Sequence, residues 1–138
     1  MELIWDGIRQ AFWLLFTQDP EIWAITWLSL KISGSATLLS LLLGIPIGIF
    51  LALTLFPGRS ITVALINTGM GLPPVVVGLF VSIFLWRSGP LGFLELLYTP
   101  TAMILAQVVI AFPIVAGLTM AAFQTLNPNL SLQLLGIG

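Results

Sequence analysis

Two consecutive prolines lie inside a long apolar stretch without any charged residue. The charged side chains leave three empty tracts, residues 32–58, 60–86 and 96–138, and Pro73 and Pro74 lie near the middle of the second. Each tract exceeds the about 20 residues that a helix needs to cross a bilayer. In lipid, a broken helix is tolerated only where protein or a wet cavity covers the freed backbone groups. Because many carriers expose backbone to a solute in this way, the pair predicts a broken span and favours transport.

The composition supports a membrane protein and excludes several other classes. The chain has 138 residues, of which 59% are hydrophobic and 7% charged, and its formal net charge is -1. That balance is too apolar for a dispersed soluble domain. No basic cluster is present, so we expect no nucleic-acid partner. The sequence contains neither His nor Cys, which removes the usual zinc ligands, thiol chemistry and the commonest general base. We predict no metal site, no cofactor and no catalytic residue.

The N-terminal segment predicts an amphipathic helix at the membrane interface. Over residues 2–17, apolar residues recur at helical spacing, and charged or polar residues fall on the other side. Trp5 and Trp13 suit the headgroup zone, where amphipathic rings are favoured. The acidic start differs from the positive region of a signal peptide. We therefore expect residues 1–21 to form an interfacial helix and residues 22–138 to form the membrane domain.

The charge-free tracts predict three membrane spans. The expected spans are residues 22–56, 61–86 and 101–123. In the first, Pro46 favours a kink, while Gly44 and Gly48 allow a second helix to pack closely. Lys31 lies about two turns inside this span, where its stem can reach back to the headgroups. After the turn that follows, Ser60 is expected to cap the next helix.

The residues around the double proline carry a family resemblance. The relevant run is Asn67-Thr68-Gly69-Met70-Gly71-Leu72-Pro73-Pro74-Val75-Val76-Val77-Gly78. It resembles the permease subunit of bacterial tungstate-type ABC importers, a group related to molybdate and sulfate permeases. Three further segments agree: Phe56-Pro57-Gly58-Arg59, Arg87-Ser88-Gly89-Pro90-Leu91-Gly92 and Thr99-Pro100-Thr101-Ala102-Met103. The resemblance covers essentially the whole chain, and its central motif is specific for oxyanion permeases.

This resemblance implies an all-α membrane protein with the type I ABC importer permease (MetI-like) fold. It implies an ABC ATPase subunit as cytoplasmic partner, an extracytoplasmic solute-binding protein and a permease homodimer in the plasma (inner) membrane. It places the loop at Arg59 in the cytoplasm and the N-terminus outside. Charge alone does not decide this orientation, because the loops at Arg59 and Arg87 carry one positive residue each.

The resemblance also identifies a cytoplasmic segment that couples the permease to the ATPase. In the family this segment carries a Glu-Ala-Ala…Gly signature, of which residues 127–138 match only the glycine end. We expect the coupling segment here to include Asn127, Pro128, Leu135 and Gly136 and to be incomplete. The two further spans of the family do not follow. The chain is therefore expected to correspond to roughly the N-terminal half of a permease and not to transport unaided.

The candidate translocation residues lie at the double proline and one turn before it. Helix N-termini and free backbone N–H groups bind oxyanions without a fixed charge. The backbone opened at Gly71, Pro73 and Pro74 is the candidate gate, and Asn67 and Thr68 are candidate pathway residues. A packing role stays open for each of them, because prolines kink helices and polar side chains join helices within membranes.

Other functions remain open beside tungstate import. The chain has no phosphate-binding loop, so ATP hydrolysis would occur on a partner subunit, and no enzymatic activity is expected. The alternatives are a molybdate or sulfate permease, a non-transporting membrane fragment or assembly subunit, and a pore-forming oligomer. The last is less favoured because no ring of charge is available to select ions.

Overall fold

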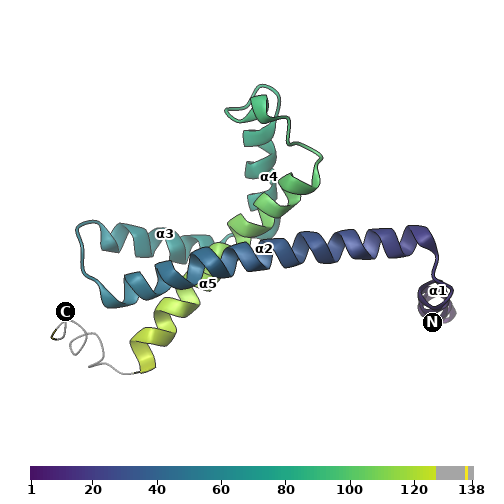
Figure 1. The fold of residues 1–138 in the computed structure, drawn as a ribbon, viewed down its shortest axis with the longest axis horizontal. Helices are drawn as coiled ribbons and strands as arrows, with labels where there is room; N and C mark the ends of the chain where they lie inside the picture. The colour runs from purple at the N-terminus through teal and green to yellow at the C-terminus, as the bar shows by residue number, and fades with distance from the viewer. Residues whose placement is uncertain (127–135, 137–138) are drawn as a thin grey trace.

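A computed structural model describes residues 1–126 and Gly136 of the chain, and within them all regular structure is helical (Figure 1). The elements are α1 (Glu2–Phe16), α2 (Pro20–Leu53), α3 (Arg59–Gly71), α4 (Pro74–Leu85), the short 3-10 helix η1 (Gly92–Leu94) and α5 (Pro100–Leu126). The prediction of an all-α protein is confirmed, and α2 and α5 correspond to the first and third expected spans.

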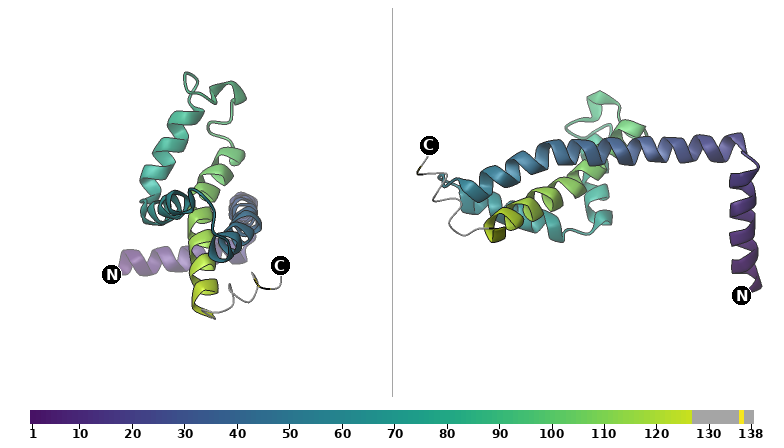
Figure 2. Two further views of the ribbon diagram at one scale, coloured as in Figure 1. Left: turned by 90° about the vertical axis from the view of Figure 1, so that its left-hand side faces the viewer. Right: turned by 60° about the horizontal axis from the view of Figure 1, so that its bottom comes forward.

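The N-terminal helix α1 is separate from the rest of the molecule. It covers almost the predicted residues 2–17, contains no buried residue, and lies crosswise to α2 in both views of Figure 2. The chain turns at Gln18, whose φ is 54°. Asp19 then caps α2 by accepting a hydrogen bond from the N–H of Glu21 at 3.0 Å, and Pro20 occupies the first helical position, where its missing N–H has no cost. The long helix thus begins two residues before the expected start.

Two helices, α2 and α5, are long and apolar enough to cross a membrane. They contain 34 and 27 residues, which at about 1.5 Å per residue exceeds a hydrocarbon core of about 30 Å. Each continues through an internal proline, Pro46 in α2 and Pro113 in α5. One proline inside a long helix removes one backbone donor, and here the helix persists on both sides of it.

Glycines in α2 allow α5 to approach closely. A Cβ added at Gly48 would lie 2.6 Å from the carbonyl oxygen of Ala116, and one added at Gly44 would lie 2.7 Å from Val115 Cγ1. The packing role predicted for these two glycines is therefore confirmed. Since Gly44 faces Val115 and Gly48 faces Thr119, residue numbers rise together and the two helices run parallel.

Helix α3 runs in the opposite direction against α5. A Cβ at Gly69 would lie 2.8 Å from Pro113 Cγ, while one at Gly117 would lie 3.4 Å from Ile66 Cγ2, so numbers rise in one helix as they fall in the other. The core shared by α2, α3 and α5 contains Leu51, Ile66, Ala116 and Met120. Helices α2 and α5 thus run parallel and in direct contact, and α3 packs on α5 in the antiparallel direction.

The turn between α2 and α3 corrects one prediction. Ser60 does not cap α3, because the helix begins one residue earlier, at Arg59, with Gly58 in the N-cap position. Gly58 has a φ of 86°, a left-handed conformation that glycine adopts without strain. Arg59 reaches back and donates a hydrogen bond from Nε to the carbonyl oxygen of Leu51 at 2.9 Å. One free carbonyl at the end of α2 is thereby satisfied.

Candidate functional site

The double proline breaks the second expected span sharply. Helix α3 ends at Gly71, α4 begins at Pro74, and the chain bends by 109° between them. Leu72 and Pro73 both adopt extended backbone, with ψ of 131° and 139°, as expected for residues that precede a proline. The predicted interruption is confirmed. At about 1.5 Å per residue neither short helix alone crosses about 30 Å, so the pair is a broken span or a re-entrant loop.

The backbone groups at the break are mainly acceptors. Pro73 and Pro74 have no N–H to donate to the carbonyls four residues earlier. The bonds formed there run from Leu72 N–H to the Gly69 carbonyl at 3.4 Å and from Val76 and Val77 N–H to the Pro73 carbonyl at 3.0 and 3.2 Å. The start of α4 therefore offers few spare N–H groups. This geometry favours a gate at the break over a cradle of N–H donors for an oxyanion.

The five candidate pathway residues are all exposed: Asn67, Thr68, Gly71, Pro73 and Pro74. Asn67, Thr68 and Gly71 lie on the side of α3 turned away from α5, because the residues of α3 that face α5 are Ile66, Gly69 and Met70. The Thr68 hydroxyl donates to the Ala64 carbonyl of its own helix at 2.8 Å. The five candidate residues are thus exposed neighbours along the chain.

An apolar groove lies between α4 and α5, next to the break. Its volume is about 410 Å³, and its lining is Leu72, Val77, Phe80, Val81, Phe84, Leu85, Leu91, Leu105 and Val109. None of these side chains is polar, so the groove does not suit a hydrated oxyanion. Its apolar lining suits an apolar side chain or a lipid tail instead.

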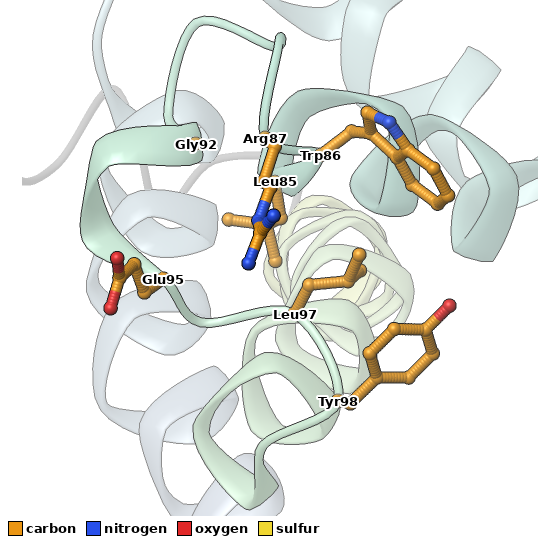
Figure 3. Close-up of a pocket in the computed structure, with 7 residues that line it drawn as sticks. All are labelled: Leu85, Trp86, Arg87, Gly92, Glu95, Leu97 and Tyr98. Atoms are coloured by element: carbon orange, nitrogen blue, oxygen red, sulfur yellow. The ribbon is translucent and has the colours of Figure 1, made fainter.

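A second pocket lies in the loop between α4 and α5 (Figure 3). It has a volume of about 440 Å³ and is lined by Leu85, Trp86, Arg87, Gly92, Glu95, Leu97 and Tyr98. The loop folds back over the end of α4, where Leu91 N–H donates to the Phe84 carbonyl at 3.0 Å. A Cβ at Gly89 or Gly92 would collide with backbone carbonyls there. Since Arg87 and Glu95 bring opposite charges, the pocket has no net preference for an anion.

The sequence did not reveal that α5 supports the break from behind. Gly69, one turn before the double proline, lies directly against Pro113 of α5. The sequence does show prolines near the middle of both tracts, Pro73 and Pro74 in one and Pro113 in the next. No local sequence pattern indicates that these two regions are in contact. Of the predicted coupling residues, Asn127, Pro128 and Leu135 lie outside the described residues. Gly136 is described alone, and an added Cβ there meets no atom within 4 Å.

The fold defines an integral membrane protein built from apolar helices. Two helices are long enough to cross a membrane, and a third crossing is possible if the bent pair counts as one span. The described residues leave many large apolar side chains exposed. Such a surface is typical of a protein that contacts lipid. The class is that of multi-pass, all-α membrane proteins.

Sequence comparison identifies the family. The chain is 44% identical over 119 residues to the tungstate uptake system permease protein of Peptoclostridium acidaminophilum, covering 86% of this chain and 52% of that protein. It is 46% identical over 107 residues to a probable anion ABC transporter permease of Haloferax volcanii, covering 78% and 46%. The molybdenum transport permease of Escherichia coli K12 is 34% identical over 125 residues, covering 81% and 52%.

The chain is a homologue of the permease subunits of tungstate-type ABC transporters. It spans about half the length of the curated relatives it matches. Like those permeases, it is a protein of the plasma membrane, and none of these relatives is a catalytic subunit. No protein-family profile matches the chain, and no solved structure does.

Proposed function

We propose that the chain is the N-terminal, membrane-embedded part of a permease that imports an oxyanion, with tungstate as the main candidate. The relative at 44% identity is a tungstate permease, and the molybdenum relative is more distant at 34%. Tungstate is the cargo in this proposal.

The gate in this proposal is the exposed surface formed by Asn67, Thr68, Gly71, Pro73 and Pro74. The observation that carries it is the 109° bend at the double proline inside a charge-free segment. A polar amide such as that of Asn67, exposed on a membrane helix, is costly against lipid. Water in a pathway or a second protein surface would cover it. Gly69 and Pro113 hold the inner side of the break against α5, which leaves the outer side free to move.

The partners follow from the permease assignment. Uphill transport would be driven by ATP hydrolysis on an ABC ATPase in the cytoplasm, and an extracytoplasmic solute-binding protein would deliver the ion to a permease homodimer. We place the N-terminus outside and the α2–α3 turn in the cytoplasm. The end of α5 then also lies on the cytoplasmic side, since α2 and α5 run parallel. Residues 1–21 would lie at the interface, and residues 22–138 would belong to the ABC type-1 transmembrane domain.

Gene deletion in the source cells tests this function. Deleting the segment that encodes these residues is expected to abolish ATP-dependent tungstate uptake at low external tungstate, and the wild-type segment should restore it. Excess molybdate should compete more strongly than excess sulfate. Unchanged tungstate uptake after deletion would contradict the proposal, and loss of molybdate or sulfate uptake in its place would identify the alternative cargo.

A further inference from the structure

The pocket in the loop between α4 and α5 carries two charges of opposite sign that do not face each other. Figure 3 shows the Arg87 guanidinium turned toward Leu85 and Leu97, whereas the Glu95 carboxylate points away from it. Both charged residues are exposed. Because the two groups are turned apart, each is free to bind a different part of one ligand, the guanidinium an anionic group and the carboxylate a cationic one.

The backbone of this loop is held in an unusual conformation. Glu95 and Tyr98 have φ values of 51° and 65°, in the left-handed region that residues with a side chain rarely adopt. The N–H of Glu95 donates to the Gly92 carbonyl and the N–H of Thr99 to the Leu96 carbonyl, both at 3.1 Å. Backbone of this kind clusters at ligand sites, where the surrounding structure holds it in place. The pocket is therefore a shaped part of the loop.

The residues around the pocket are typical of the membrane surface. Trp86 directly follows α4, Tyr98 lies two residues before α5, and both side chains are exposed. Tryptophan and tyrosine are enriched at the level of the lipid headgroups. Since α5 is long and apolar enough to cross a membrane, the loop before it lies at one end of that span. The two charges of the pocket are thus at the level of lipid phosphates and ammonium groups.

A groove between α4 and α5 continues directly from this pocket. Its volume is about 240 Å³, and it shares three lining residues with the pocket, namely Leu85, Leu97 and Tyr98. We call it the loop-side groove. Because it runs from the loop along two apolar helices, it leads from the headgroup level toward the lipid tails.

The loop-side groove offers an apolar and open surface to a visitor. Small residues, Gly78, Ala102 and Ala106, line it, and a Cβ added at Gly78 meets no atom within 4 Å. Its hydroxyl groups are already bonded within the chain. The Ser82 hydroxyl donates to the Gly78 carbonyl at 2.8 Å, and the Thr99 hydroxyl donates to the Leu96 carbonyl. The groove therefore suits an acyl chain, which has no polar group to satisfy.

We propose that the pocket and the loop-side groove together bind one molecule of phosphatidylethanolamine. Arg87 binds the phosphate of the headgroup, and Glu95 accepts hydrogen bonds from its primary ammonium group. One acyl chain lies along the groove toward Ala106. A transmembrane helix of another protein segment would cover the apolar lining but would bring no anionic group to Arg87, so the charges favour a lipid as the occupant.

The two charges also predict which headgroup is preferred. A primary ammonium carries three N–H donors for the Glu95 carboxylate, whereas the quaternary ammonium of phosphatidylcholine has none. A lipid with net negative charge, such as phosphatidylglycerol, is repelled by the same carboxylate. The inference concerns a lipid site and does not depend on which ion is transported, so its failure would leave the proposed function standing.

Photocrosslinking in vesicles tests the site. The permease that contains this chain is reconstituted with a small fraction of lipid that carries a photoactivatable acyl chain, with an ethanolamine, choline or glycerol headgroup in parallel preparations. The ethanolamine lipid should label α5 near Met103, a residue of the groove, most strongly, as measured by peptide mass spectrometry. Equal labelling by the three lipids would indicate bulk lipid contact only. Absence of labelling would indicate that protein covers the groove, and either result overturns the proposal.

Charge variants test the headgroup contacts. Arg87→Gln and Glu95→Gln should each lower labelling by the ethanolamine lipid about fivefold, because each removes one charged partner. Glu95→Gln should also raise labelling by the glycerol lipid, since the repulsion is gone. Neither variant should unfold the protein in lipid-free detergent, because both side chains are exposed. Arg59→Gln, which removes a charge at the α2–α3 turn, is the matched control. Labelling that matches this control in both pocket variants would overturn the assignment.

A filled groove tests the position of the acyl chain. Gly78→Leu places a larger side chain in the loop-side groove and leaves both charges in place, so labelling near Met103 should fall for all three lipids. Gly34→Leu on α2 is the matched control, because an added Cβ there also meets nothing within 4 Å, and it should label as the wild type does. Helix content shows whether each variant is folded. Wild-type labelling in folded Gly78→Leu would exclude the groove as the site of the chain.

Discussion

Proline and glycine occur both where α2 meets α5 and where α3 meets α4, with opposite results. Pro46 and Pro113 each lie inside a continuous helix, whereas Pro73 and Pro74 separate two helices that diverge by 109°. A single proline removes one donor and disfavours helix at one preceding residue. Two in succession remove two donors and keep Leu72 extended. The number of consecutive prolines therefore decides whether the helix continues.

Two pairs of glycines near these prolines differ in the same way, although Gly69 of α3 also lies close to α5. Gly44 and Gly48 lie against α5, where an added Cβ would come within 3 Å of other atoms. Gly71 at the break and Gly78 in α4 would meet nothing within 4 Å. The first pair serves close packing, and the second pair has room around it. A rigid α2–α5 unit next to an open α3–α4 bend is the arrangement that a gate on a fixed support requires.

Replacing both prolines of the break should have the largest effect. In Pro73→Ala with Pro74→Ala, two N–H groups return and α3 can continue into α4. Tungstate uptake by the permease that contains this chain is expected to fall to background. Spin labels at positions 61 and 83, both exposed, should move apart toward the about 33 Å of a straight helix.

The control for this variant is Pro46→Ala, which leaves α2 continuous and should transport normally. Uptake at the wild-type level by the double alanine variant, together with a lengthened label distance, would show that the bend is not needed for transport. An unchanged distance would show that the surrounding structure, and not the proline pair, sets the bend.

The next largest effect is expected at the α2–α5 contact. Gly48→Ala places a Cβ 2.6 Å from the backbone carbonyl of Ala116, and backbone cannot move aside as a flexible side chain can. We expect a loss of about 2–3 kcal/mol in the free energy of unfolding, typical of overpacking. This free energy of unfolding can be measured in a mixed-detergent titration that follows the helix content of the protein.

Gly34→Ala on the same helix is the matched control, because nothing lies within 4 Å of the added Cβ. It should raise stability slightly, by about 0.5–1 kcal/mol, since alanine favours helix over glycine. Similar stability losses at both positions would mean that α5 does not pack on α2 as described.

A smaller effect is expected where α5 supports the break. Gly69→Ala brings a Cβ to 2.8 Å from Pro113 Cγ, and should cost about 1–2 kcal/mol of stability. Pro113→Ala removes Cγ but keeps Cβ, which lies 2.9 Å from the added atom, so the clash is partly relieved and the double variant should lose less than the sum of the two single variants. A double-mutant cycle measures this coupling, and strict additivity would contradict the contact.

The sequence was sufficient for the helices and the break but not for their contacts. Charge-free tracts located α2 and α5 within a few residues, and consecutive prolines located the break, because these signals act on local backbone. The prediction that Ser60 caps α3 was wrong, because Gly58 adopts a left-handed conformation in the N-cap position and α3 begins one residue earlier, at Arg59. The contact of Gly69 with Pro113 joins residues from different tracts, and only the packed structure shows which glycine faces which proline. The roles of Asn67 and Thr68 stay predictions.

The smallest expected effect lies at the turn that joins the rigid unit to the bend. Arg59 Nε donates to the Leu51 carbonyl at 2.9 Å, and Leu51 belongs to the core shared by α2, α3 and α5. Arg59→Gln shortens the side chain and should leave that carbonyl without this donor, at a cost of about 1 kcal/mol because the site is only partly buried. Arg87→Gln is the matched control, since Arg87 is exposed on the loop that follows α4. This substitution should change stability little. The detergent titration used for Gly48→Ala applies here too. If Arg59→Gln were as neutral as Arg87→Gln, the α2–α3 turn would be held by Gly58 and apolar packing alone, and α3 would be less firmly joined to the rigid unit than the hydrogen bond indicates.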